Sequence, residues 1–154
     1  MQPTNPTSPD SSARLSRMLC FAIYSASHAF TRVYKPLLDR IGLTYPQYLV
    51  LLVLCEEDNL MVKQIGERMF LDSGTLTPLL KRLESAGFLR RVRDGQDERQ
   101  VRVALTSQGR AIEEQAASIM NELVCAIGQP EEKVLALTEE VARLRAALSH
   151  RSSP

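Results

Sequence analysis

The stretch "LDSGTLTPLLKRLESAGFLRRVRDGQDERQVRVALT", residues 71–106, decides the fold of this chain. Its first half carries four leucines at the i, i+3, i+4 and i+7 spacing of one helical face: Leu76, Leu79, Leu80 and Leu83. Gly87 follows, where a glycine commonly ends a helix. In the second half, apolar residues alternate on both sides of a polar turn at residues 94–97, which is typical of a β-hairpin. The stretch therefore predicts a helix followed directly by a hairpin.

Charge is distributed unevenly along the chain. Residues 81–93 contain five basic side chains and one acid, Glu84, whereas residues 113–140 contain seven acids and a single lysine. The net charge of the 154 residues is only +1. Because the basic side chains gather in the helix and hairpin, a net charge near zero does not exclude nucleic-acid binding.

A second short helix is predicted just before this stretch, in "NLMVKQIGERMF" at residues 59–70, with Ile65 and Met69 facing inward. Two short helices, a tight connection and a basic hairpin describe a winged helix-turn-helix. Its second helix would enter the major groove, and its hairpin would reach the adjacent backbone or minor groove. The candidate DNA-contacting residues are Ser73, Thr75, Thr77, Lys81, Arg82, Arg91, Arg93 and Arg99. Each feature taken alone also fits a solvated amphipathic helix and a charged surface turn.

Proline 78 lies inside the predicted recognition helix, where it removes one backbone hydrogen bond. Two readings remain open at this stage. The helix either begins late, with Thr77 as its cap and Pro78 in its first turn, or it begins earlier and accepts a bend.

The segments on either side of this core are predicted to be helical. A first helix starts at Ser11 or Ser12, runs to about Tyr34 or beyond, is disturbed by Pro36 and ends by Gly42. A second helix has Thr44 as its cap and Pro46 in its first turn. Residues 49–54 of that helix are apolar on every side, so we expect it to be buried.

Two more helices are expected after the hairpin. A long helix starts at Thr106 and is broken by Gly128 and Pro130, and a last helix ends near Leu148. The predicted fold is mainly α with a small β-hairpin wing (α+β). Residues 12–148 form one domain between a disordered arm at 1–11 and a loose end at 149–154.

The sequence contains no signal peptide and no apolar run approaching 18 residues, which predicts a cytoplasmic protein with reduced thiols. Its three cysteines lack CxxC spacing, and its two histidines, His28 and His150, are not placed to complete a zinc site. No metal or other cofactor is expected.

All four tyrosines lie between residues 24 and 48, and the first of them, Tyr24, is four residues after Cys20. At that spacing both side chains share one helical face, so the phenol can donate a hydrogen bond to a thiolate. Arg17 could favour the thiolate, and the apolar neighbours suit a hydrophobic peroxide. The alternatives are that Cys20 is a small buried hydrophobic residue and that the tyrosines fill a dimer seam.

Residues 62–111, "VKQIGERMFLDSGTLTPLLKRLESAGFLRRVRDGQDERQVRVALTSQGRA", resemble the core of the MarR family of transcriptional regulators. The portion "DERQVRVALTSQG" is similar to the wing signature of that family. The segments "LCFAIYSAS", "VYKPLLDRIGLTYPQYLVLLVL" and "LDSGTLTPLLKRLE" resemble the organic hydroperoxide regulators, the OhrR branch. The likeness covers roughly residues 12–148.

The resemblance implies a homodimer that binds an inverted repeat in double-stranded DNA. Residues 12–42 and 107–148 would form the dimerisation helices, and residues 60–105 the winged helix-turn-helix. It also implies that Cys20 senses an organic hydroperoxide and that Tyr34 and Tyr45 reach its thiolate across the dimer, with Tyr24 nearby. In the two-cysteine branch, Cys125 would be the resolving cysteine.

Two rival functions stay open beside this peroxide-sensing repressor. The first is a repressor released by a small ligand bound between the dimer helices and the DNA-binding lobe. The second is a thiol peroxidase that turns over, although an enzyme has no need of a basic helix and wing. Cys55 ends an apolar helix and is expected to be a core residue.

Overall fold

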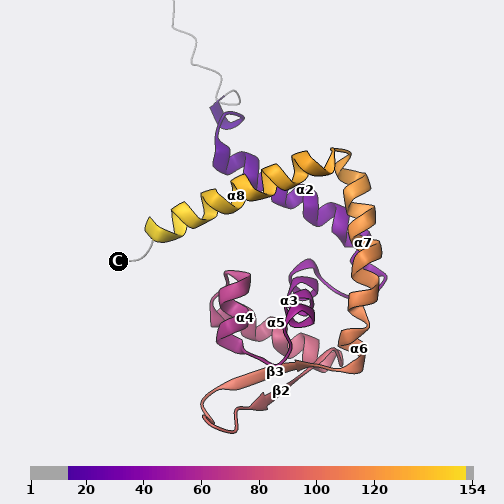
Figure 1. Cartoon of the computed structure of the whole chain (residues 1–154), viewed down its shortest axis with the longest axis vertical. Helices are drawn as coiled ribbons and strands as arrows, with labels where there is room; N and C mark the ends of the chain where they lie inside the picture. Colours follow the sequence, from indigo (N-terminus) through magenta and orange to yellow (C-terminus); the bar gives the residue numbers. More distant parts are fainter. Residues whose placement is uncertain (1–13, 152–154) are drawn as a thin grey trace, which may run out of the picture. The chain divides into compact units, whose positions relative to one another are not determined.

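The computed structural model describes residues 14–151. The predicted arm at residues 1–11, the helix start at Ser11 or Ser12 and residues 152–154 lie outside this range. The chain divides into two compact units, one ending at Arg110 and the other beginning at Ala111 (Figure 1).

The first long helix, α2, spans Leu19–Asp39 and contains Pro36. Arg14 and Leu15 are helical, and a turn at residues 16–17, in which the Met18 N–H donates to the Leu15 carbonyl oxygen at 3.0 Å, separates them from α2. The single first helix that the periodicity predicted is therefore interrupted before Leu19. Pro36 does not end the helix, because a missing N–H removes only one backbone bond. The chain turns at Gly42, whose φ of +71° is left-handed.

Helix α3 spans Tyr45–Glu56 and confirms the predicted cap, since Thr44 is its N-cap residue and Pro46 lies in its first turn. The side chain of Gln47 accepts a hydrogen bond from the Thr44 N–H at 2.9 Å. Burial of the apolar run at 49–54 is confirmed for Val50, Leu51 and Leu54, and Tyr48 is enclosed beside them, whereas the other three residues of the run are half-buried. Helices α2, α4 and α5 and strand β3 all pack against it.

Helices α4 (Val62–Met69) and α5 (Ser73–Ser85) form the helix-turn-helix. Asp72 caps α5, because its carboxylate accepts the Thr75 N–H at 2.9 Å. The early cap resolves the question of Pro78, which lies within the helix rather than in its first turn. Leu76, Leu80 and Leu83 are buried as predicted, and Gly87 follows the helix with a φ of +84°.

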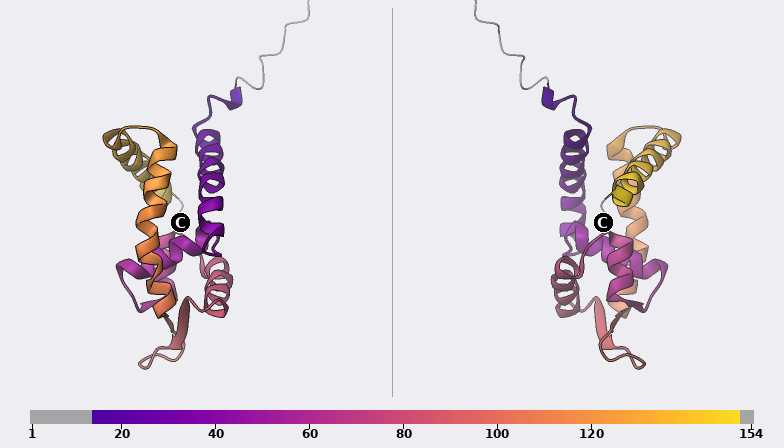
Figure 2. Two further views of the ribbon diagram at one scale, coloured as in Figure 1. Left: turned by 90° about the vertical axis from the view of Figure 1, so that its right-hand side faces the viewer. Right: turned by 90° about the vertical axis from the view of Figure 1, so that its left-hand side faces the viewer.

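The hairpin is confirmed as β2 (Leu89–Arg93) and β3 (Val101–Leu105), which pair antiparallel with Leu89 opposite Leu105. A third strand, β1 (Leu60–Met61), pairs with β3 and was not predicted. The sheet order is therefore β1-β3-β2. A two-residue strand is too short to show alternation, so sequence periodicity could not reveal it. The tip of the hairpin lies at the end of this unit opposite α2 (Figures 1 and 2).

The long helix predicted from Thr106 is divided in two. Helix α6 (Ser107–Arg110) closes the first unit, and α7 (Ile112–Ile127) opens the second. Gly128, with a φ of +62°, ends α7 as predicted. Helix α8 runs over Glu131–Arg151, beyond the predicted end at Leu148. Among residues 14–151, no helix has the length and apolar character needed to cross a membrane.

Gly109 is required where α6 meets the start of β2. A Cβ atom at this position would collide with the carbonyl oxygen of Phe88 and lie 2.9 Å from the Leu105 side chain. The Thr106 hydroxyl donates to the same Phe88 carbonyl at 3.0 Å, and the Thr106 N–H donates to it at 3.1 Å. Backbone held by these bonds cannot move aside cheaply.

We expect Gly109→Ala to lower the free energy of unfolding by about 1–3 kcal/mol, the usual cost of forcing extra volume into a packed site. Gly95→Ala is the matched control, because a Cβ atom there meets nothing within 4 Å. Urea unfolding of both variants at one protein concentration measures the difference. Equal stability of the two variants would contradict the close approach at Gly109.

Candidate nucleic-acid interface and thiol site

The outer face of α5 carries the side chains predicted to contact DNA. Lys81 and Arg82 are exposed, as is Ser73 at the N-terminal end of the helix. Two threonines also serve the helix itself. The Thr75 hydroxyl donates to the Asp72 carboxylate at 3.0 Å, and the Thr77 hydroxyl donates to the Ser73 carbonyl oxygen at 2.7 Å. The two threonine hydroxyls are thus engaged in hydrogen bonds of the helix itself. The exposed side chains of Ser73, Lys81 and Arg82 make no such bond within α5.

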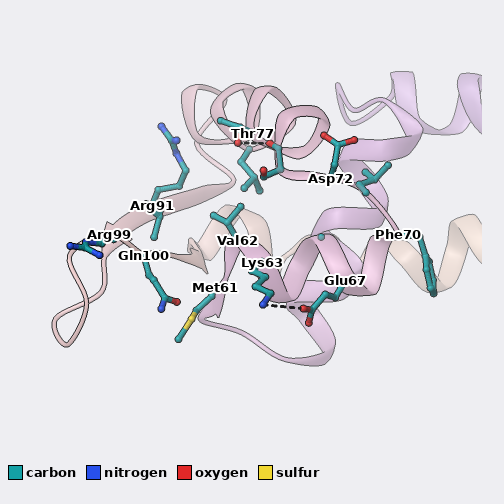
Figure 3. A pocket seen from close by; sticks show the side chains of 15 residues that line it. Met61, Val62, Lys63, Glu67, Phe70, Asp72, Thr77, Arg91, Arg99 and Gln100 are labelled. Atoms are coloured by element: carbon teal, nitrogen blue, oxygen red, sulfur yellow. Dashed lines mark hydrogen bonds and ion pairs between the residues drawn. The ribbon is translucent and has the colours of Figure 1, made fainter. Parts of the chain in front are cut away.

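A groove of about 870 Å³ lies between α4, α5 and the hairpin. Figure 3 shows Arg91, Arg99 and Gln100 on its hairpin wall, Thr77 on α5, and Lys63 on α4. Lys63 lies 3.9 Å from Glu67 of the same helix, an exposed pair that a stronger anion can replace at little cost. Sequence periodicity did not single out Lys63 or Gln100, because only the fold brings them to this groove.

The three predicted hairpin arginines differ in their surroundings. Arg93 and Arg99 are exposed. Arg91 is half-buried, and its Nη2 lies 2.7 Å from the carboxylate of Glu84 on α5. Arg93 and Arg99 thus stay candidates for phosphate contacts, whereas Arg91 already has an anionic partner within the fold.

Three carboxylates hold the hairpin in place, one of them within the hairpin and two by joining it to other parts of the unit. Asp94 is buried and pairs with Arg102 at 2.7 Å, and its carboxylate accepts the Gln96 N–H at 2.8 Å. These bonds, the Gln96 N–H first and Arg102 next, hold the pKa of Asp94 below its usual value. The N–H and guanidinium of Arg91 likewise lower the pKa of Glu84.

The third carboxylate, Asp58, precedes β1. It accepts the Leu105 N–H at 2.9 Å and the Asn59 N–H at 2.7 Å, and it pairs with Arg110. Burial alone would raise its pKa, but the two N–H groups and the guanidinium outweigh burial and lower it. Sequence periodicity singled out neither Asp58 nor Arg102, and it placed Asp94 only in the turn of the hairpin. For Asp94, the available signal was an acid directly after a basic segment.

Cys20 lies in the first turn of α2 as an exposed thiol. Leu19, Ile23 and Tyr24 around it are exposed too, with 60%, 38% and 62% of their surfaces accessible. Cys20 is therefore not a buried core residue in a single chain. Tyr24 is on the same helix four residues later, as predicted, and its ring packs edge-on against His28 with centroids 4.4 Å apart. Arg17 lies in the turn before α2, so helical spacing does not bring it to the thiol.

The other tyrosines gather at the opposite end of α2. Tyr34 packs against Tyr45, with ring centroids 4.5 Å apart, and against Tyr48 at 6.1 Å. Burial, and then the neighbouring phenols, raise the pKa of Tyr34 to about 12, so it stays a hydrogen-bond donor at neutral pH. Fourteen residues separate Tyr34 from Cys20 on one helix, a rise of roughly 21 Å. These tyrosines therefore cannot reach the Cys20 of their own chain.

The remaining thiols differ in exposure. Cys125 on α7 is exposed, and Cys55 on α3 is half-buried. Burial raises the pKa of the Tyr48 phenol, and the nearby Tyr45 and Cys55 raise it further. Within residues 14–151, no group of three or more His, Cys, Asp or Glu side chains could hold a metal ion.

A basic helix, a three-stranded wing and a groove between them define the class: a winged-helix DNA-binding protein. The family model of the transcriptional regulators SarA and Rot matches residues 32–116. The chain belongs to this MarR-type family of winged-helix transcriptional regulators, as its sequence resemblance indicated.

Two curated relatives extend the match. Over 106 residues, the chain is 50% identical to the organic hydroperoxide resistance transcriptional regulator of Bacillus subtilis (strain 168), covering 69% of this chain and 72% of the relative. Over 146 residues, it is 49% identical to the HTH-type transcriptional regulator TtmR of Methylorubrum extorquens (strain PA1), covering 95% and 75%.

Solved structures agree with the fold. The structure of reduced AbfR bound to DNA superimposes with a TM-score of 0.72 at 36% identity, over 90% of this chain and 96% of that one. AbfR itself comes from Staphylococcus epidermidis. Overoxidised AbfR bound to DNA gives a TM-score of 0.70, also at 36% identity, over 89% and 97% of the two chains.

Removing the Asp58 charge tests how the sheet is anchored. Asp58→Asn should lower the free energy of unfolding at pH 7 by about 1–2 kcal/mol, since bonds from N–H groups and an arginine to a charged acceptor are lost. The pKa of Asp58 is lower in the folded protein than in the unfolded chain. Its carboxylate therefore contributes to the free energy of unfolding above about pH 4, and this contribution is lost as pH falls through the pKa of the folded state. The difference between wild type and variant should therefore shrink on acidification.

Urea unfolding at several pH values measures this difference. Asp39→Asn is the control, because Asp39 pairs with Lys35 on an exposed helix face and should contribute less than about 0.5 kcal/mol. A difference for Asp58→Asn that stays constant down to pH 3 would argue against an anchoring carboxylate.

Proposed function

We propose that the protein is a repressor that binds double-stranded operator DNA as a homodimer and is released when an organic hydroperoxide oxidises Cys20. The observation that carries the sensing half is the exposed thiol of Cys20 within an apolar surface of α2. Such a surface favours an alkyl peroxide over a small polar one. The name of the Bacillus subtilis relative supports the same inducer class.

DNA binding rests on α5, the groove and the hairpin. Lys81 and Arg82 contact base edges in the major groove or the phosphates beside it. Arg93 and Arg99 contact the adjacent phosphate backbone or minor groove. Lys63 adds a cation on the α4 side of the groove. The DNA-bound structures of AbfR, which aligns over most of this chain, support this arrangement.

The redox site needs a second copy of the chain. Tyr34 and Tyr45 lie too far along α2 to serve the Cys20 of their own chain, so they would donate hydrogen bonds to the partner's thiolate. Both phenols are held protonated, because burial raises their pKa values. A protonated phenol stabilises a thiolate by donating a hydrogen bond to it, and it can then donate a hydrogen bond to the leaving oxygen of the peroxide.

The chemistry proceeds in two steps. The Cys20 thiolate attacks the peroxide, so that an S–O bond forms, the O–O bond breaks and an alcohol leaves after taking up a proton. Cys125 of the other subunit, which is also exposed, then condenses with the sulfenic acid, and water is released as an intersubunit S–S bond forms. The existence of a disulfide form of AbfR supports this end state.

Disulfide formation gives a route to DNA release. The two Cα atoms must approach to about 4.4–6.8 Å, which requires the dimerisation helices to shift. The recognition helices move with them, and DNA tolerates little change in half-site spacing. A covalent bond then holds a conformation that is minor in the reduced protein.

DNA binding is tested with a duplex enriched from a random-sequence pool by the reduced protein. Its affinity should fall steeply with salt, and Arg99→Gln should reduce the slope of log K against log salt by about 1, because one phosphate contact is lost. Lys35→Gln on α2 makes the same charge change away from the hairpin and should leave the slope unchanged. Fluorescence anisotropy across a salt series measures both, and the absence of salt-sensitive binding by the wild type would defeat the proposal.

Sensing is tested by adding cumene hydroperoxide to the protein–DNA complex. Wild type should release DNA and recover with reductant, whereas Cys20→Ser should bind DNA and ignore peroxide. Cys125→Ser should still form sulfenic acid, seen by intact mass, but no covalent dimer on a non-reducing gel. Cys55→Ser is the matched control and should respond as wild type does.

Tyr34→Phe should slow the oxidation of Cys20 without unfolding the dimer, since only a hydroxyl is lost. If Cys20→Ser still released DNA on peroxide addition, the sensor would lie elsewhere. Equal alkylation rates for all three cysteines would instead favour a repressor released by a bound ligand.

A further inference from the structure

Arg91 and Glu84 make a three-contact link between the recognition helix and the wing. The Arg91 N–H donates to Glu84 Oε1 at 2.8 Å, its Nε donates to Oε2 at 2.8 Å, and its Nη2 lies 2.7 Å from Oε2. Both carboxylate oxygens are therefore engaged. The two side chains keep only 27% and 34% of their surfaces exposed, so solvent screens this pair less than a fully exposed one.

A carboxylate that accepts from both the backbone N–H and the guanidinium changes what Arg91 can do at the DNA face. The guanidinium lines the groove, yet its charge is balanced by a carboxylate in direct contact. A phosphate approaching Arg91 would also meet the negative charge of Glu84, and binding it would break well-formed hydrogen bonds. The neighbouring Arg90 is exposed and faces the other side of the strand, so it has no such restraint.

The position of the link suggests its task. Glu84 lies in the last turn of α5, the helix that carries Lys81 and Arg82. Arg91 lies in the middle of β2, two residues before Arg93 and on the strand that leads to the wing tip. The pair therefore sets the separation and tilt between the two elements that must touch one duplex at the same time.

We propose that Arg91 is a positioning residue rather than a DNA contact, and that its pair with Glu84 holds the wing at the angle that specific duplex binding requires. This inference rests on the proposed DNA-binding function. It revises the sequence-based assignment of Arg91 to the phosphate contacts and adds Glu84, an acid at a DNA-binding face, as a residue needed for specificity.

The two roles predict opposite results for Glu84→Gln. If Arg91 binds phosphate, removing the acid frees a cation and DNA binding stays equal or tightens. If Arg91 positions the wing, Glu84→Gln weakens binding to the enriched duplex about three- to tenfold, the range expected for losing one partly buried charged pair. Binding to a random-sequence duplex of the same length should change less than about twofold, because nonspecific binding needs only the phosphate charge.

Arg91→Lys supplies a second, independent variant, since lysine keeps the charge but cannot make the forked contact. It should weaken specific binding as Glu84→Gln does, with the salt slope unchanged, and the double variant should be no weaker than either single one. Arg90→Lys is the matched control on the same strand and should bind as wild type does. Thermal unfolding of each variant identifies any that fails to fold, in which case the other single variant decides.

The outcomes distinguish failure of the positioning role of Arg91 from failure of the proposed DNA binding. Specific binding that stays equal or tightens in Glu84→Gln overturns the positioning role. An equal loss on the enriched and the random duplex also overturns it, because a lower folded fraction alone would produce that pattern. If the wild type itself shows no salt-sensitive duplex binding, the proposed function fails and not this inference alone.

Discussion

Helix α3 is the element around which the rest of its unit packs, because its apolar residues point in all directions and little of its surface suits water. Tyr48, Val50, Leu51 and Leu54 are enclosed where α2, α4, α5 and β3 pack against the helix. The helix-turn-helix, the wing and the first long helix are thus assembled around one central element. Each apolar side chain enclosed in this way stabilises the fold by roughly 1.5–3 kcal/mol relative to exposure.

The wing depends on charge as well as on apolar burial. Leu89, Val103 and Leu105 are buried at its base, but its strands are short and the outer side of β2 is largely exposed, so hydrophobic packing alone would hold the rest of the hairpin weakly. Asp58 holds β3 at the base, Asp94 and Arg102 close the tip, and Glu84 joins the wing to α5. Acids within a basic segment are expected to weaken DNA binding, but here they order the surface that carries the cations.

The thiol and the phenols show how helix geometry separates groups that are close in sequence. Cys20 and Tyr24 share one turn of α2, whereas Tyr34 lies at the far end with Tyr45 and Tyr48. A site that combines Cys20 with the distant tyrosines therefore calls for two chains. Sensitivity to a hydrophobic oxidant would then be a property of the dimer, since neither half is complete in one chain.

The sequence by itself determined most of the helices, the cap at Thr44, the glycine that follows α5 at Gly87, the hairpin and the basic face of α5, because these follow from local periodicity and backbone preference. The family was also readable from contiguous motifs. Only the tertiary structure decided that α5 begins at Ser73 with Pro78 inside it, that a third strand joins the sheet, and that Arg91 is paired with Glu84. Asp58 meets Leu105 across 47 positions, and Asp94 meets Arg102 across a turn. Such pairings depend on how separate elements pack in space, and no spacing rule along the chain encodes them.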